Sequence, residues 1–253
     1  MKDPRSILIT GASSGIGEAL AMTYAGPGVS LVLSGRDAGR LEAVAAACRQ
    51  RGATVHTEII DVADRGAMAR WIDEIDRATP VDLVVANAGI GVGSADGFET
   101  EEQTRAVFGV NLGGAFNTVL PLVPRFVARR RGQIALLSSL ASFRGFPGSP
   151  TYCGSKAALR VWGEGLRGDM HAYGVEVSVI CPGFVASRIT ARNEFPMPFL
   201  MGAESAAAIV KRGLARNRGR IAFPFPMYFA IWLLGTFPPF LTDPLLMRLA
   251  KKR

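Results

Sequence analysis

Histidine and cysteine are scarce in this chain of 253 residues, which holds two histidines and three cysteines. Cys48, Cys153 and Cys181 are an odd number, and their spacing is not that of metal ligands. His56 and His171 lie far apart in the sequence, so neither a metal site nor a histidine-containing triad is predicted. A disulfide scaffold is excluded as well, and we expect reduced thiols in a cytoplasmic compartment.

The chain also lacks a linker, a low-complexity stretch and any internal repeat beyond an alternation of strand and helix patterns. Its length fits one large α/β domain or two small ones, and without a linker we expect a single domain over residues 1–253. Residues 1–5 lead directly into the first apolar run, so no secretory leader is expected.

Acidic residues are outnumbered, with 21 Asp and Glu against 29 Lys and Arg, and the formal net charge is +8. The densest basic clusters are Arg129-Arg130-Arg131 and Lys251-Lys252-Arg253. The first is expected to end a long helix, where cations suit the negative end of the helix dipole. Because aromatic and basic residues do not interleave, we expect a solvated charged face and no nucleic-acid binding.

Short apolar runs alternate with longer amphipathic stretches along the chain. Strands are predicted near residues 6–10, 29–34, 54–60, 82–86, 133–138, 175–181 and 220–223. Helices are predicted near 15–25, 38–51, 65–78, 101–130, 151–172 and 203–216. This alternation predicts an α/β fold with a doubly wound parallel sheet of about seven strands and helices on both faces. Ligands bind such sheets at the C-terminal ends of the strands.

A glycine-rich turn, with Gly11, Gly15 and Gly17, follows the first predicted strand and precedes a helical pattern. Glycines let the backbone approach a pyrophosphate, and a helix N-terminus offers free N–H groups and the positive end of the dipole. The spacing G-x-x-x-G-x-G differs from the general G-x-G-x-x-G pattern. Taken alone, the turn also fits an ordinary tight connection.

Tyr152 and Lys156 are four residues apart in a predicted helix, so they lie on one face of it, and Ser139 precedes Tyr152 by thirteen residues. A phenol has a pKa of about 10, and a neighbouring ammonium is expected to lower that pKa. A serine hydroxyl brought close can hydrogen-bond a substrate oxygen. The three residues together can protonate or deprotonate an oxygen on a carbon that gains or loses hydride.

These motifs occur together with Asn87-Ala88-Gly89, Asn111 and Pro182-Gly183. In order and spacing the set resembles the short-chain dehydrogenase/reductase family over residues 5–225. The resemblance implies a Rossmann-type fold and a catalytic tetrad of Asn111, Ser139, Tyr152 and Lys156. In that tetrad Tyr152 is the acid/base, Ser139 orients the substrate oxygen, Lys156 also holds the nicotinamide ribose, and Asn111 anchors a water.

The resemblance also implies the residues that bind a nicotinamide dinucleotide. The glycine-rich turn supplies Gly11, Ser13, Ser14, Gly15, Ile16 and Gly17, and Arg36 follows the second strand. The adenosine half is expected to contact Asp61, Val62, Asn87, Ala88 and Gly89, and the nicotinamide half Tyr152, Lys156, Pro182, Gly183, Val185 and Ser187. Ser187 stands where the family often has threonine.

The end of the second predicted strand favours NADP(H) over NAD(H). An acidic residue at a strand tip binds the ribose 2′-hydroxyl of NAD, but this chain has Gly35 followed by Arg36. A glycine leaves room for a 2′-phosphate and a guanidinium can pair with it, with help from Ser13 and Arg40. Asp37 is a contrary sign, although it can cap the helix that follows.

Residues 225–253 depart from the family pattern and form an apolar C-terminal extension. Eleven residues separate Pro226 from Pro238, fewer than the roughly 20 that a membrane-spanning helix needs. Three interpretations stay open: a cover that lines an apolar substrate pocket, an interface with a second subunit, or a peripheral membrane contact aided by Trp232 and the terminal basic cluster. The Met-rich segment 195–201 suits either a flexible lid over the substrate or ordinary core packing.

Besides a peripheral membrane protein whose reductase activity serves lipid metabolism, two function classes follow from these patterns. The first is an NADP(H)-dependent carbonyl reductase or alcohol dehydrogenase for an apolar or lipid-like small-molecule substrate, in a homodimer or homotetramer. The second is a non-catalytic NADP(H)-binding sensor or scaffold, against which the intact set of Ser139, Tyr152 and Lys156 argues.

Overall fold

The computed structural model describes residues 1–91, 98–192 and 196–248. In these residues the strands form one parallel sheet in the order β3-β2-β1-β4-β5-β6-β7. The strands are β1 (Ser6–Thr10), β2 (Ser30–Gly35), β3 (Thr54–Ile59), β4 (Leu83–Ala86), β5 (Gly132–Leu137), β6 (Val175–Pro182) and β7 (Arg220–Phe223). The prediction of a doubly wound parallel sheet of about seven strands is confirmed.

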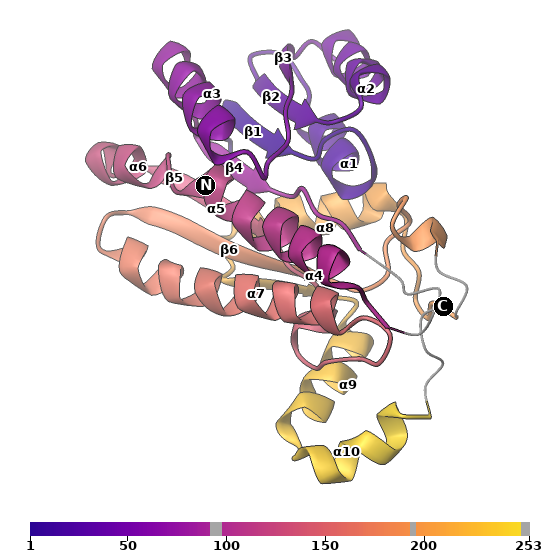
Figure 1. The fold of residues 1–253 in the computed structure, drawn as a ribbon. Coiled ribbons are helices and arrows are strands. Elements are labelled where there is room, and N and C mark those ends of the chain that lie inside the picture. The colour runs from indigo at the N-terminus through magenta and orange to yellow at the C-terminus, as the bar shows by residue number, and fades with distance from the viewer. Residues whose placement is uncertain (92–97, 193–195, 249–253) are drawn as a thin grey trace.

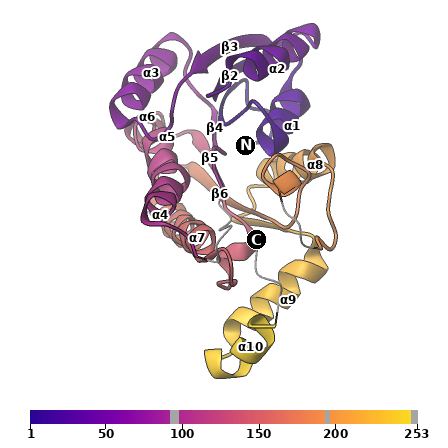
Figure 2. The same cartoon turned by 45° about the vertical axis from the view of Figure 1, so that its right-hand side comes forward.

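Helices cover both faces of the sheet, as Figure 2 shows. One face carries α1 (Gly15–Tyr24), α2 (Ala38–Gln50) and α8 (Ala203–Ala215). The other carries α3 (Arg65–Ala78), α4 (Glu101–Phe108), α5 (Gly114–Val119), α6 (Val123–Arg129) and α7 (Pro150–His171). The central strands are buried on both sides, which explains why β1 is a continuous apolar run rather than an alternating one.

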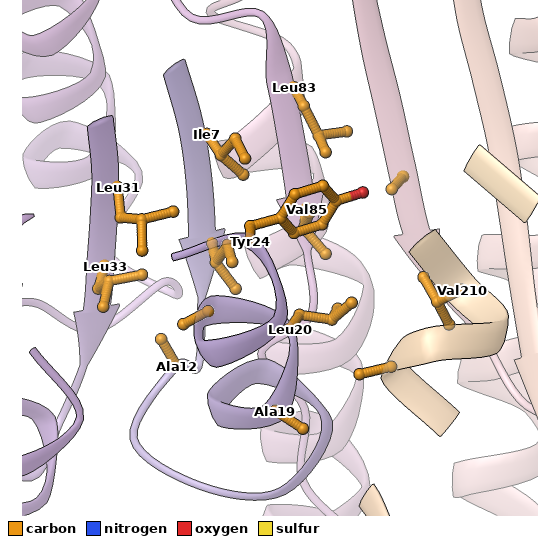
Figure 3. Packing of buried hydrophobic residues seen from close by; sticks show 14 of the residues in the cluster. Ile7, Ala12, Ala19, Leu20, Tyr24, Leu31, Leu33, Leu83, Val85 and Val210 are labelled. Carbon is orange, nitrogen blue, oxygen red and sulfur yellow. The ribbon is translucent and has the colours of Figure 1, made fainter. Parts of the chain in front are cut away.

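One apolar core lies between the sheet and α1, and Figure 3 shows part of it. Leu20 and Tyr24 of α1 lie in this core together with Ile7 of β1 and Val85 of β4, and Val210 of α8 belongs to the same cluster. Burial of this kind contributes roughly 25 cal/mol per Å² of apolar surface removed from water. The core therefore fixes α1 against the two central strands, where the glycine-rich turn begins.

The helix predicted over 101–130 is confirmed in part, because α4, a π-helical stretch (Gly109–Gly113) and α5 follow one another without a gap, and a turn at 120–122 separates α5 from α6. The break after α5 coincides with Pro121 and Pro124, which lack the N–H that a continuing helix requires. At Gly114 a Cβ would lie 2.5 Å from a methyl group of Val62, so the glycine permits a close contact there. Close packing and proline thus override the helical periodicity.

The stretch Glu101–Arg129 is also long and apolar enough to cross a membrane when only length and composition are considered. Buried core helices pass the same test, and Val107, Val119 and Phe126 of this stretch are fully buried in the protein. Its apolar character is therefore accounted for by packing against the sheet and α7.

The basic cluster at Arg129–Arg131 ends α6, as expected for a helix terminus, although α6 is short. Arg129 forms an ion pair with the buried carboxylate of Asp76 at 2.8 Å, and Arg131 pairs with Asp82 at 3.3 Å. These ion pairs join the end of α6 to α3 and to the residue before β4, so Arg129 and Arg131 do not form a patch of unpaired cations. The second cluster, Lys251–Arg253, lies outside the described residues.

Two helices that the sequence patterns did not predict follow β7: α9 (Phe225–Thr236) and α10 (Pro239–Leu246). Both project from the body of the protein and are drawn in yellow in Figures 1 and 2. At residues 225–241 the absence of charged residues hides the amphipathic period on which helix prediction depends.

Helix α7, which carries Tyr152 and Lys156, lies close against β5 and β6. At Gly163 in its middle, a Cβ would come within 2.5 Å of Leu136 and 2.7 Å of Val179, both side chains of the sheet. At Gly165, two residues later, a Cβ would meet nothing within 4 Å. The two glycines form a matched pair that separates close packing from helix propensity.

We expect Gly163→Ala to lower the free energy of unfolding by roughly 1–2 kcal/mol, because overpacking outweighs the gain in helix propensity. Gly165→Ala is expected to raise it by up to about 1 kcal/mol. Denaturant midpoints of the two variants measure the difference. Equal midpoints would show that the approach of α7 to the sheet is not tight.

Candidate active site

A cavity of about 650 Å³ lies at the C-terminal ends of the central strands. It is located where the order of the strands reverses, beside β1 and β4, which is where open α/β sheets bind ligands. Most of the predicted site residues line it: Gly11, Ser13, Ser14, Gly15, Ile16, Arg36, Asp61, Val62, Asn87, Ala88, Gly89, Ser139, Tyr152, Lys156, Pro182, Gly183, Val185 and Ser187. Gly17 and Asn111 are buried behind this wall.

The glycine-rich turn forms one end of the cavity. Gly11 and Gly15 have φ values of +65° and +61°, a region that side chains rarely adopt. A Cβ on Gly11 would lie 2.8 Å from the backbone of Ala88, and one on Gly17 would lie 2.5 Å from the amide nitrogen of Asn87. Ser14, the N-cap of α1, makes no side-chain capping bond, so the first N–H groups of α1 face the cavity without a cap.

Asn87 holds the glycine-rich turn against the end of β4. Its side-chain amide donates to the carbonyls of Thr10 and Gly11 at 2.9 and 3.0 Å. The backbone N–H groups of Asn87 and Ala88 both donate to the Thr10 hydroxyl at 3.2 Å. Asn87 therefore braces the turn as well as lining the cavity, and Thr10 completes the same network.

Tyr152 and Ser139 meet at the opposite end of the cavity. Ser139 is the N-cap of a short 3₁₀ turn after β5, and its hydroxyl accepts from the Ala141 N–H at 3.1 Å. Burial raises the pKa of the Tyr152 phenol, while a hydrogen bond with Ser139 acts in the opposite direction and lowers it. The two predicted hydroxyls therefore lie close enough for Ser139 to act on the pKa of the phenol.

Lys156 is buried below Tyr152, with 3% of its surface exposed. Its Nζ donates to the Leu137 carbonyl at 2.8 Å and lies 5.8 Å from the centre of the Tyr152 ring. Burial lowers the pKa of the Lys156 ammonium to about 8. The expectation that Lys156 lowers the Tyr152 pKa is wrong for this state, since burial dominates the phenol and Nζ is directed at a carbonyl.

Asn111 does not reach the cavity wall, although the tetrad pattern includes it. Its Oδ1 accepts from the Ile90 N–H at 2.8 Å, and its Nδ2 donates to the Ile90 carbonyl and to the Ser155 hydroxyl, both at 3.0 Å. Gly89 lies between Asn111 and Lys156, because a Cβ there would be 3.2 Å from Asn111 Oδ1 and 3.3 Å from Lys156 Nζ. Asn111 thus supports the segment that faces Lys156.

Arg36 and Arg40 line the end of the cavity that is formed by β2. The Arg36 side chain is 64% exposed, and its guanidinium is 3.9 Å from the Asp61 carboxylate. Asp37 caps α2 by accepting from the Arg40 N–H at 3.0 Å and forms an ion pair with the Arg40 side chain at 2.8 Å. The capping role expected for Asp37 is confirmed. Gly35 lies close to Ser13, because a Cβ on Gly35 would come within 3.1 Å of the Ser13 hydroxyl.

Sequence patterns missed several residues that build the site. Ser138, set aside because its spacing misses the pattern by one, donates from its buried hydroxyl to the Lys156 carbonyl at 2.8 Å. Ser155 donates to the Tyr152 carbonyl at 2.8 Å, and Thr190 accepts from the Ser187 N–H at 2.9 Å. Only the position of Ser138 beside Ser139, and of Ser155 beside Lys156, signals these roles in the sequence.

The segment 195–201, for which a lid and core packing stayed open, is exposed at Pro196 and over 198–200 and half-buried at Met197 and Met201, so none of these residues is buried in the core. Phe195 lies outside the described residues. Phe199 is 60% exposed. Met201 forms an isolated bridge with Val185: its N–H donates to the carbonyl of Phe184, and its carbonyl accepts from the N–H of Ala186. Among the described residues, neither this segment nor 225–241 contributes to the cavity lining.

The residues present fit a nicotinamide dinucleotide. The cradle of Gly11 and Gly17 has no room for a side chain, and the uncapped N-terminus of α1 faces it, which suits a pyrophosphate. Arg36 suits a phosphate on the ribose at the β2 end of the cavity, and the two hydroxyls of Ser139 and Tyr152 suit an oxygen at the other end.

Comparison with known proteins agrees with a site that fits a nicotinamide dinucleotide. Residues 5–195 match the model of the short chain dehydrogenase family. An uncharacterized oxidoreductase of Myxococcus xanthus (strain DK1622) is 38% identical over 246 residues, which cover 97% of each chain.

Solved structures with the same fold include a short-chain dehydrogenase/reductase from Burkholderia phymatum in complex with NAD. It has a TM-score of 0.84 and 26% identity, over 100% of this chain and 98% of that one. A short-chain dehydrogenase from Sphingobium yanoikuyae in complex with NADPH has a TM-score of 0.81 over 98% and 97% of the two chains, and at 24% identity this likeness concerns the fold alone. The chain belongs to the short-chain dehydrogenase/reductase family of NAD(P)-dependent oxidoreductases.

Proposed function

We propose that this protein is an NADP(H)-dependent oxidoreductase that interconverts a carbonyl and an alcohol on an apolar or lipid-like substrate, with Tyr152 as the acid/base. The observation that carries the proposal is the convergence of Ser139, Tyr152 and Lys156 at one end of a cavity whose other end is a glycine cradle. Acid/base chemistry and dinucleotide binding then share one continuous site.

In this proposal the protein moves a proton and orients two molecules. When bound, the nicotinamide dinucleotide supplies or accepts the hydride. Tyr152 donates a proton to the carbonyl oxygen, or removes it from the alcohol, and Ser139 orients that oxygen by a hydrogen bond. Lys156 provides a buried cation below the phenol and a donor for a ribose hydroxyl, while Asn111 is a positioning residue that holds the Ile90 segment.

The dinucleotide is held by chain segments from four strand ends. The N-terminus of α1 and the backbone of Gly11–Gly17 take the pyrophosphate, Asp61 and Val62 take the adenine, and Pro182–Val185 with Ser187 flank the nicotinamide. NADP(H) is favoured because Arg36 has a long, exposed contact with Asp61 that leaves its guanidinium available. Asp37, the contrary sign, is occupied by Arg40 and the cap of α2.

An apolar substrate is supported by the side chains around the catalytic end. Ile90, Val110 and Ile189 line the cavity, and 38% of the surface of Ile189 is exposed to solvent. Apolar walls with a few convergent polar groups are the usual form of a small-molecule site.

The proposal extends to organisation of the chain. Residues 1–253 act as one dehydrogenase domain with 225–253 as an apolar extension, and the reduced, buried cysteines suit the cytoplasm. A homodimer or homotetramer is favoured by exposed apolar side chains on the helices α4 and α7, where Phe108 is 37% and Val161 59% exposed.

Replacement of the phenol tests the acid/base role. Tyr152→Phe is expected to lower kcat about 100-fold or more, because proton transfer contributes that much, with little change in NADPH affinity. Tyr173→Phe, at an exposed tyrosine beyond the end of α7, is the matched control and is expected to keep normal turnover. Normal kcat in the Tyr152→Phe protein would exclude the proton-transfer role.

The cofactor preference is tested at the β2 end. Arg36→Ala is expected to weaken NADPH binding by roughly 10- to 100-fold, which corresponds to the free energy of one charge-assisted hydrogen bond. It is expected to weaken NADH binding much less. The control is Arg77→Ala, which removes another exposed, ion-paired guanidinium far from the cavity lining. Fluorescence titrations with both dinucleotides measure the ratio, and equal weakening of the two would contradict a phosphate contact.

The depressed pKa of Lys156 predicts a pH dependence of stability. Below pH 8 the folded protein must keep a buried ammonium, which costs stability. Between about 8 and 10.5 the unfolded chain holds a proton that the folded protein has lost, so the free energy of unfolding rises with pH.

Relative to Lys156→Met, the cofactor-free wild type is therefore expected to become more stable as the pH rises through this window. Unfolding curves of both proteins at several pH values give the difference. A constant difference would mean that Lys156 has an ordinary pKa.

A further inference from the structure

The outward side of α9, together with the turn that leads into α10, exposes large apolar side chains. Phe225 is 70% exposed, Phe229 49% and Trp232 41%. We call these three residues, with Phe237, Phe240 and Leu241, the aromatic face. Phe240 and Leu241 are 74% and 57% exposed, so the face continues into α10.

The aromatic face is one continuous surface on one side of the helix. Residues 225, 229 and 232 follow the spacing of neighbours on an α-helix. The rings of Phe225 and Phe229 are stacked with centroids 6.2 Å apart, and Phe229 and Trp232 are 6.1 Å apart. An exposed apolar surface of this kind marks an interaction site.

The opposite side of α9 is packed on the protein, so the aromatic face is held in place. Tyr228 contacts Phe143 edge to face at 5.4 Å, and a Cβ on Gly235 would lie 2.3 Å from the Phe143 carbonyl. In α10, Asp243 forms an ion pair with Arg144 at 2.8 Å. The body of the protein thus presents α9 and α10 with a fixed orientation.

Shape and length favour a lipid surface as the partner. Both helices project from the body of the protein (Figures 1 and 2), and the aromatic face is exposed on them. α9 has twelve residues, too few to cross a bilayer, which needs about 20. A short apolar helix with Phe and Trp suits the boundary between headgroups and acyl chains.

Charge favours an anionic lipid surface over a second copy of the chain. Between residues 221 and 247 the only charged residue is Asp243, and Arg144 neutralises it. Four cations follow in sequence: Arg248, Lys251, Lys252 and Arg253. Contact between two copies through this face would bring these like-charged C-terminal segments together, whereas anionic headgroups attract them.

We propose that the aromatic face docks the protein on an anionic lipid bilayer, with α9 and α10 lying in the membrane interface. The N-terminal turn of α9 backs onto the cavity: a Cβ on Gly183, which lines it, would lie 2.9 Å from Met227 Sδ. Docking therefore brings the cavity wall close to lipid. Binding to lipid is independent of the proposed reaction, and it can be tested without turnover.

The test uses the full chain in vesicle flotation. Wild type is expected to float with vesicles of phosphatidylcholine and phosphatidylglycerol, and less with phosphatidylcholine alone or at high salt. The double variant Phe229→Ser/Trp232→Ser is expected to lose affinity roughly 100-fold, since two aromatic side chains no longer enter the interface. Phe199→Ser, at an exposed aromatic residue outside the aromatic face, is the control and is expected to float as wild type does.

A second readout places the face at the lipid. Brominated acyl chains are expected to quench tryptophan emission in wild type, and the quenching is expected to disappear in Trp232→Phe. Dinucleotide titration and circular dichroism of each variant establish that it is folded.

Two results would overturn the proposal. One is wild type that stays unbound with anionic vesicles. The other is equal flotation of wild type and the double variant. If, in addition, light scattering shows an oligomer without vesicles that the double variant lacks, the aromatic face is a contact between subunits instead.

Discussion

Two hydrogen bonds join the middle of α7 to the end of β5: the Ser138 hydroxyl donates to the Lys156 carbonyl, and Lys156 Nζ donates to the Leu137 carbonyl, both at 2.8 Å. They can form because Gly163 lets α7 lie directly on the side chains of the sheet. The spacing of four residues within α7 then places Tyr152 on the same helix face as Lys156, beside the loop that follows β5. A helix displaced by one methyl group would move the phenol away from the end of the cavity, so the geometry of the site depends on this contact.

The cavity combines two electrostatic environments. At the β2 end Arg36 is exposed to water, where a guanidinium can bind a phosphate at low cost in desolvation. At the β5 end burial raises the pKa of Tyr152 and lowers that of Lys156 to about 8, so burial disfavours the charged form of each group in the cofactor-free protein. The glycine cradle at Gly11 connects the two ends.

Much of the fold is predictable from the sequence, because strands such as β1 and β7 are apolar runs bounded by turn residues and begin where they were expected. The walls of the site are predictable for the same reason, since the motifs follow strand ends. The turn between α5 and α6 coincides with Pro121 and Pro124, so it has a signal in the sequence. The direction of Lys156 Nζ depends on a backbone carbonyl, and that contact has no signal in local periodicity. α9 was missed because a helix with one side packed on the protein and an apolar outer side has no amphipathic period.

In the proposed function, one site binds NADP(H) and carries out carbonyl chemistry on apolar substrates. The most direct measurement titrates the purified protein with NADPH and NADH and then follows NADPH oxidation with aldehydes, ketones and quinones of increasing chain length. The account predicts tighter binding of NADPH than of NADH, and turnover that improves with apolar chain length. Binding without turnover on every carbonyl would favour a non-catalytic sensor, and failure to bind either dinucleotide would contradict the assignment of the cavity.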